Sequence, residues 1–76
     1  MPAKHKGKPV EVIAALLNVP VDELKTRRFA ITKAWTPVYL WQGNLYCEQP
    51  REPRALLGQV WKRIQGTNVW VTSAPR

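Results

Sequence analysis

A proline inside an apolar, helix-like segment is the feature that most constrains how this chain can fold. Residues 16–29, LLNVPVDELKTRRF, begin with apolar side chains, contain Pro20 and end in a stretch with three cations. Proline lacks the N–H that a helix interior needs, and its ring clashes with the preceding turn, so one helix cannot continue through this segment. The sequence therefore predicts two helices joined by a short turn.

Apolar residues before this proline recur at helical spacing, and one face has Val10, Ile13, Ala14 and Leu17. Pro9 suits the first position of a helix, where its missing N–H would be unpaired anyway. Glu11 lies in the first turn, where the helix dipole favours an anion. We expect a first helix over residues 9–18, ending at Asn18.

A second helix is expected to open at Pro20, with the acidic Asp22 and Glu23 in its first turn. Leu24 and Phe29 can face inward from this helix, which leaves outside it the cations Lys25, Arg27 and Arg28. The β-branched and bulky segment FAITKAW lowers helix propensity, so the end of this helix stays open.

Two runs rich in β-branched and aromatic residues flank QGN in TPVYLWQGNLYCEQP and predict a β-hairpin. A turn centred on Gln42–Gly43 would place four apolar side chains on one face and the two tyrosines on the other: Val38, Leu40, Leu45 and Cys47 against Tyr39 and Tyr46. A turn centred on Gly43–Asn44 would instead pair Trp41 with Tyr46. The sequence leaves both registers open.

After the linker QPREPR, Pro53 can open a third helix that ends at Gly66. Its apolar stripe is Leu56, Leu57, Val60, Trp61 and Ile64. Lys62 and Arg63 lie opposite the stripe and are expected to be solvated. The segment TNVWVT then predicts a short strand. We expect a basic arm over residues 1–8, one domain over 9–72 and a frayed tail over 73–76.

The charge of the chain is strongly positive, with 12 Lys and Arg against 5 Asp and Glu among 76 residues, for a net charge of +7. Neutralising phosphates releases counterions, so nucleic acid is the leading partner. An acidic protein surface or an anionic membrane would also satisfy this charge. No apolar run approaches the roughly 20 residues that span a bilayer, which favours a cytoplasmic protein without a membrane partner.

Residues suited to catalysis or metal binding are scarce. Cys47 is the single cysteine and His5 the single histidine, which excludes an intramolecular disulfide and a cysteine-based zinc site. The five carboxylates are scattered, and the four glycines form no phosphate-binding loop. We expect a protein that is not an enzyme, with no cofactor, metal or small-molecule substrate.

A helix, a turn, a basic helix and a hairpin, in that order, are typical of a small winged helix-turn-helix. In that α+β fold the second helix enters the major groove and the hairpin forms a wing beside it. A third helix and a short C-terminal strand complete the predicted domain. The expected core packs against the hairpin and consists of Leu16, Leu17, Val19, Leu24 and Phe29.

The stretch VEVIAALLNVPVDELKTRR followed by TPVYLWQGNLYCEQPRE resembles the excisionase-like, MerR-related winged helix family over residues 10–52. LLNV corresponds to the end of the apolar helix and Arg27–Arg28 to the family's arginine pair. Pro37–Val38 corresponds to the entry of the wing, and Gly43 to its tip.

This resemblance implies an architectural protein of a phage or mobile element in a prokaryotic cell. Such proteins bind and bend double-stranded DNA, direct site-specific recombination and often repress transcription, with possible self-association along DNA or contact with a recombinase. The implied recognition-helix residues are Lys25, Thr26, Arg27 and Arg28. The implied wing residues are Gln42, Gly43 and Asn44. The implied contacts to the DNA backbone are Lys4, Lys6, Lys8, Arg51 and Arg54.

The four tryptophans open alternatives to duplex binding. We expect at least two of them to fill the core, because a small domain needs aromatic bulk. An exposed tryptophan could stack on the bases of single-stranded nucleic acid. It could equally mark a small inhibitor-type factor that docks on an acidic protein partner. RNA also stays open as a ligand.

Overall fold

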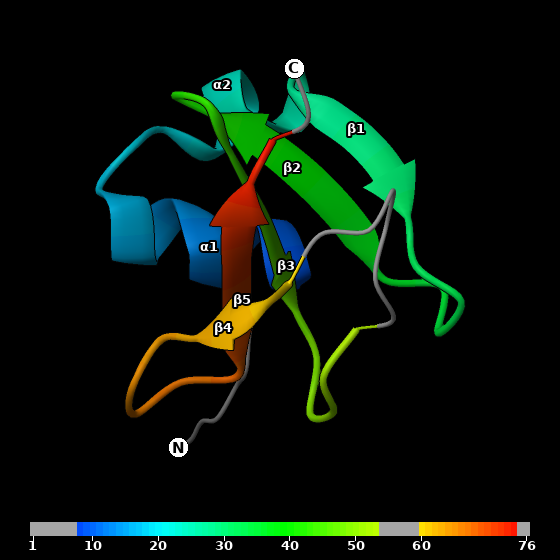
Figure 1. The fold of residues 1–76 in the computed structure, drawn as a ribbon. Helices are drawn as coiled ribbons and strands as arrows, with labels where there is room; N and C mark the ends of the chain where they lie inside the picture. Colours follow the sequence, from blue (N-terminus) through cyan, green and yellow to red (C-terminus); the bar gives the residue numbers. More distant parts are fainter. Residues whose placement is uncertain (1–7, 54–59, 75–76) are drawn as a thin grey trace.

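Two short helices lie on one face of an antiparallel sheet in the computed structural model, which describes residues 8–53 and 60–74 (Figure 1). The helices are α1 (Pro9–Leu17) and α2 (Val21–Lys25). In the described part of the chain the strands are β1 (Arg28–Ile31), β2 (Pro37–Trp41), β3 (Asn44–Glu48), β4 (Lys62–Arg63) and β5 (Val69–Ser73). The strand order is β1-β2-β3-β5-β4, so β1 and β4 are the two edges.

Helix α1 confirms the sequence prediction to within one residue. The backbone N–H of Lys8 donates to the Glu11 carboxylate at 3.2 Å, which satisfies a donor left free at the helix start. Asn18 ends the helix in the left-handed conformation, with φ of 59°, and its N–H bonds back to the last turn. The buried face contains Val10, Ile13 and Ala14, as expected.

Helix α2 ends much earlier than a recognition helix requires. The Thr26 hydroxyl donates to the Glu23 carbonyl oxygen at 2.7 Å, and the Arg27 N–H donates to the Leu24 carbonyl oxygen at 2.9 Å. This tight turn stops the helix after five residues, and Arg28 already belongs to β1. The prediction of a basic second helix reaching Phe29 is therefore wrong.

The β2–β3 hairpin confirms the register with Gln42–Gly43 at the centre of the turn. Leu40 pairs with Leu45 and Tyr39 with Tyr46. Both turn residues have positive φ, 49° and 83°, as the type I′ turn favoured in two-residue hairpins requires. The hairpin is not a free wing, however, because β2 also pairs with β1 and β3 with β5.

The third predicted helix is wrong over the described residues 60–66. Lys62 and Arg63 form β4, which pairs with β5, and the chain then turns through Gly66. Trp61 packs into the cluster on one face of the sheet, whereas Ile64 packs into the cluster on the other. That separation is impossible for two residues of one helical stripe. The leucines at 56 and 57 lie outside the described residues.

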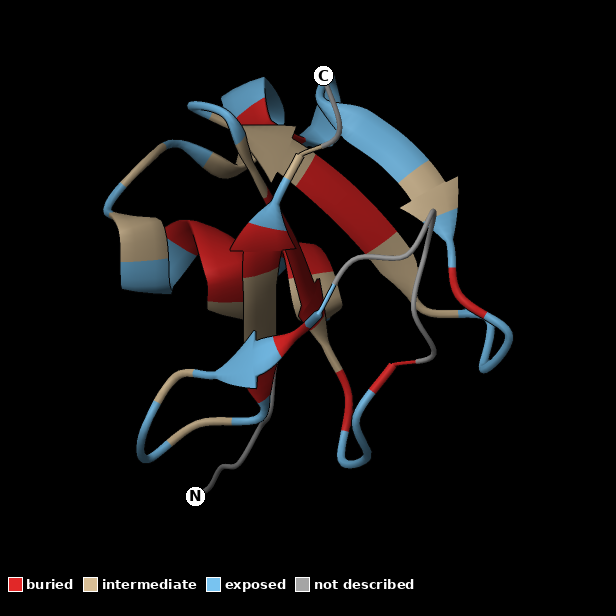
Figure 2. Ribbon diagram, viewed as in Figure 1, coloured by how far each residue is buried: buried red, intermediate tan, exposed pale blue. Residues whose placement is uncertain are grey.

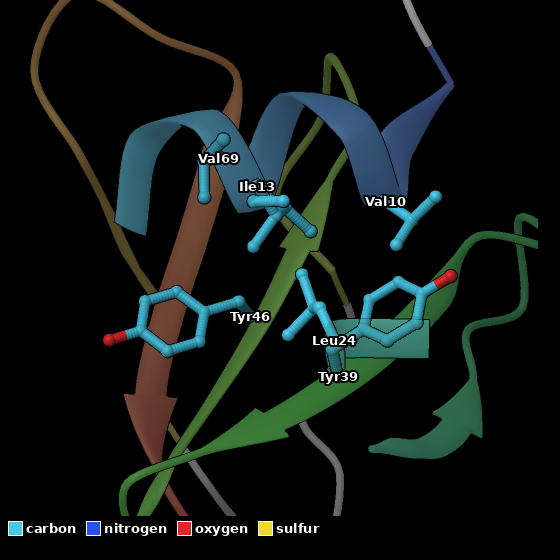
Figure 3. Packing of buried hydrophobic residues seen from close by; sticks show 7 residues of the cluster. Val10, Ile13, Leu24, Tyr39, Tyr46 and Val69 are labelled. Carbon is cyan, nitrogen blue, oxygen red and sulfur yellow. The ribbon is translucent and has the colours of Figure 1, made fainter. Parts of the chain in front are cut away.

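Apolar side chains pack on both faces of the sheet. The helix-side cluster joins α1, α2 and three strands through Val10, Ile13, Ala14, Leu24, Tyr39, Tyr46 and Val69 (Figure 3). The opposite face is built around Val38, Leu45, Cys47 and Trp61. Leu17 and Val19 are half-buried, but Leu16 and Phe29 are 40% and 42% exposed, so their predicted places in the core are wrong.

This β-rich α+β arrangement corrects the expected fold class. A winged helix-turn-helix needs a full second helix for the major groove and a third helix behind it. In this structure Arg28 and Phe29, which were expected in the second helix, belong to the edge strand β1. Residues 62–63, which were expected in the third helix, pair in the sheet as β4. The winged helix-turn-helix prediction is therefore wrong.

Candidate nucleic-acid interface

Strand β1 is an edge of the sheet and is exposed over most of its length (Figure 2). We use "β1 edge" for Lys25–Trp35, which includes the end of α2, β1 and the turn that follows. Its cations are all exposed: Lys25, Arg27, Arg28 and Lys33. The same segment exposes three apolar side chains: Phe29, Ile31 and Trp35. No acidic residue occurs between Glu23 and Glu48, so every charged side chain of this segment is positive.

The arginine pair is held at the start of β1 by contacts with β2. The Leu40 N–H donates to the Arg27 carbonyl oxygen at 2.8 Å, and the Arg27 guanidinium lies 5.4 Å from the centre of the Trp41 ring. Arg28 pairs with Tyr39, where burial raises the pKa of the phenol and the arginine charge opposes that shift. Both arginines are therefore positioned at one end of the edge, with their charges open to solvent.

Thr32 organises the turn at the other end of β1. Its hydroxyl accepts the N–H groups of Ala34 and Thr36, both at 3.2 Å, and donates to the Gln49 side-chain oxygen at 3.2 Å. The backbone N–H of Trp35 donates to the Thr32 carbonyl oxygen at 2.9 Å, and this bond closes the turn. Because Thr32 and Gln49 are buried, these bonds lie in a low-dielectric site and define the turn strongly.

Trp35 is presented at the tip of this turn with 84% of its surface exposed. The other tryptophans are packed: Trp61 is buried, Trp41 joins the helix-side cluster, and Trp70 donates its indole N–H to the Gln49 carbonyl oxygen at 2.9 Å. The expectation that at least two tryptophans are structural is confirmed, and Trp35 is the exception.

A hollow of about 260 Å³ lies between the β1–β2 turn and residues 49–53. Lys33 and Arg51 line it with positive charge, and Glu52 lines it with a carboxylate. The rest of its wall consists of Thr32, Ala34, Gln49 and Pro53. The β1 edge thus has cations at both ends and a hollow of mixed polar and apolar lining at the turn that contains Trp35.

The residues predicted for the recognition helix and those predicted for the wing lie at the same end of the sheet. Lys25, Thr26, Arg27 and Arg28 are exposed together as predicted, but in a turn and an edge strand instead of a recognition helix. The turn Gln42–Asn44 lies at the same end of the sheet, since Trp41 directly precedes it and lies under Arg27.

The backbone-contact residues divide differently. Arg51 lies at the far end of the β1 edge, beside Lys33. Lys8 is exposed at the start of α1. Lys4, Lys6 and Arg54 lie outside the described residues.

Phe29, Ile31 and Lys33 were missed as site residues because they were assigned to a helix or to the segment after it. One signal for them was available in the sequence, namely the absence of any carboxylate between Glu23 and Glu48 in a segment that contains both cations and bulky residues.

The described residues outside the β1 edge offer little other chemistry. Cys47 is fully buried, and burial first and Glu48 second raise its pKa to about 12, which makes it a poor nucleophile. Within residues 8–53 and 60–74, no group of three His, Cys, Asp or Glu could hold a metal ion. Neither described helix has the length and apolarity to cross a membrane.

No protein-family model, curated protein or solved structure matches this chain.

Proposed function

We propose that this protein binds nucleic acid along the β1 edge. The observation that supports the proposal is that exposed cations and exposed apolar side chains lie together on one strand and its flanking turns. Cations that neutralise phosphates release bound counterions, and neighbouring apolar or aromatic side chains can contact bases. The two properties occur together on this edge.

The second edge of the sheet supplies the comparison. Strand β4 also has two exposed cations, Lys62 and Arg63, so positive charge alone does not distinguish the edges. What distinguishes the β1 edge is its exposed bulky side chains: Phe29, Ile31 and Trp35 lie there, whereas Val60 is the one exposed large apolar residue near β4 among the described residues. We therefore assign the binding surface to β1.

The mode of binding proposed here differs from insertion of a helix into a major groove. Helix α2 has five residues, and its only cation, Lys25, lies in the last turn. DNA bending and control of recombination were implied by a winged helix, and the structure removes that basis. We therefore propose nucleic-acid binding, without DNA bending or control of recombination.

Binding of labelled single-stranded and duplex oligonucleotides across a salt series tests the proposal. We expect Arg27→Ala/Arg28→Ala to weaken binding and to reduce the slope of log K against log salt by about 1.4 for a single strand or about 1.8 for a duplex if two phosphate contacts are lost. Lys62→Ala/Arg63→Ala removes the same charge from the opposite edge and is the matched control. Circular dichroism of each variant checks that the fold persists.

The two double variants separate a local surface from a general charge effect. Equal loss of affinity in both would contradict the assignment to β1, because net charge would then explain the binding. Absence of binding to any oligonucleotide at low salt would reject the function itself. An acidic protein partner on the same edge would become the leading alternative in that case.

A further inference from the structure

We infer that Trp35 is a stacking residue for an unpaired nucleobase, so that the ligand of the β1 edge is single-stranded nucleic acid. This inference rests on the proposed function and deepens it by naming the class of nucleic acid. Its starting point is an indole that contributes almost nothing to the core, with 84% of its surface exposed in a protein that packs its other tryptophans.

The backbone at Trp35 is unfavourable for a bulky residue. Its φ is 63°, in the left-handed region that Gly, Asn and Asp adopt far more readily than tryptophan. The turn is nonetheless well defined, because Thr32 accepts two N–H groups within it and the Trp35 N–H bonds back to Thr32. The loop geometry itself takes positive φ at this position. A tryptophan at such a position, with its ring in solvent, points to a role in binding instead of in folding.

The surroundings of Trp35 fit a nucleotide. Lys33, two residues earlier, and Arg51, across the hollow, offer positive charge for phosphates. Glu52 in the same hollow repels phosphate, so a backbone is expected to follow the cations of β1 while a base occupies the region near Trp35. Ala34, the residue before Trp35, and Pro53 add apolar surface to the lining of the hollow.

The exposed indole favours a single strand over a duplex. Within a duplex both faces of each internal base are covered by neighbouring base pairs, so a side chain on the outside cannot stack on them. In a single strand the base can turn out and lie against an aromatic ring, and this contact tolerates any sequence.

The test uses the full chain, a labelled oligothymidylate, an abasic strand of equal length and a duplex of the same length. We expect Trp35→Ala to weaken oligothymidylate binding roughly tenfold or more, while Trp35→Phe retains most of the affinity. Neither variant should change binding of the abasic strand or the salt slope, because the phosphate contacts remain. Val60→Ala, which truncates another exposed apolar residue, is the control and should bind as wild type.

Trp35→Asn is a second variant that is expected to keep the fold, since asparagine readily adopts the left-handed backbone conformation found at position 35. We expect it to fold at least as stably as wild type and to lose affinity for oligothymidylate as Trp35→Ala does. Wild-type tryptophan fluorescence should be quenched by oligothymidylate, and the quenching should be smaller in Trp35→Phe.

The failure of this inference can be told apart from the failure of the proposed function. Wild-type affinity of Trp35→Ala for oligothymidylate would overturn the stacking role, even where Arg27→Ala/Arg28→Ala shows that nucleic acid binds to the edge. An equal loss of affinity for the abasic strand would also overturn it, because the contact would not involve a base. Preference of the wild-type protein for the duplex would reject the single-stranded ligand.

Discussion

Three non-glycine residues of the described chain have positive φ, and each has a different origin. Asn18 terminates α1, where the left-handed conformation lets the chain leave the helix. Gln42 is the first central residue of the β2–β3 turn, whose geometry requires positive φ. Trp35 ends the Thr32–Trp35 turn in the loop between β1 and β2, at the position where a three-residue hairpin loop takes positive φ. Glycine or asparagine suits that position better, and the presence of an exposed tryptophan there makes Trp35 a candidate for function.

Gln42→Asn is expected to stabilise the fold. A left-handed residue other than glycine costs roughly 1–2 kcal/mol, and asparagine recovers part of this because Asn-Gly is the preferred type I′ pair. We expect a gain of about 0.5 kcal/mol in the free energy of unfolding, measured by urea titration. Gly43→Ala is the converse control: a methyl group there meets nothing within 4 Å, so any destabilisation reports its φ of 83°.

The short helix α2 shows how strongly packing governs the elements of this fold. Five residues cannot form a stable helix in isolation, because nucleation costs more than so few hydrogen bonds recover. Leu24 is fully buried in the helix-side cluster, next to α1 and the sheet, and supplies the missing stability (Figure 3). The position of α2 in turn determines where the arginine pair begins β1.

Leu24→Ala is expected to lower the free energy of unfolding by about 3 kcal/mol, since it removes a fully buried side chain that joins helix and sheet. Leu16→Ala on α1 makes the same chemical change at a side chain that is 40% exposed, and should cost clearly less. Urea unfolding of both variants compares them directly. Similar losses would contradict the view that Leu24 anchors α2.

Local sequence patterns predicted some elements well and others poorly. Helix α1, the hairpin and the strand around Trp70 were predicted because their periodicity and turn residues agree with the final fold. The end of α2 and strand β1 were not predicted, since Lys25, Arg27 and Arg28 suit the exposed face of a helix that continues as well as the end of a helix that stops. Strand β4 was missed because Trp61 and Ile64 have a helical spacing that the sheet overrides.

The molecule as a whole is organised by a sheet that buries side chains on both faces. Helices α1 and α2 cover one face, and Trp61 packs on the other beside Val38, Leu45 and Cys47. Burial on both faces explains why Cys47 lies in so dry an environment that the pKa of its thiol rises to about 12.

Cys47 makes the stability of the fold sensitive to alkaline pH. The folded-state pKa lies above that of the unfolded chain, roughly 8.5, so the unfolded state loses this proton first as pH rises. Stability is fully present below pH about 8.5 and falls above it, by up to about 1.4 kcal/mol per pH unit for this one group. Urea titrations between pH 7 and 10 should show the decline.

Cys47→Ala is expected to flatten that decline, whatever its effect on stability at neutral pH. The folded wild type should also resist a thiol reagent at pH 8 and react only on unfolding, because the thiolate is disfavoured and buried. A slope that is unchanged in Cys47→Ala would assign the alkaline loss to another group, with Tyr39 as the next candidate, since burial also raises the pKa of its phenol.

The amino-acid sequence was sufficient to establish the properties that depend on near neighbours. These are the positive charge, the α1 helix with its Asn18 cap, the hairpin centred on a glycine-containing turn, and the core role of several tryptophans. Where the cations would lie depended on contacts between distant segments. Pairing of Arg28 with Tyr39 turned an expected recognition helix into an edge strand, and the bond from Thr32 to Gln49 shaped the turn that exposes Trp35. Long-range pairing outweighs local propensity here because a segment of so few residues has too little intrinsic preference to resist it.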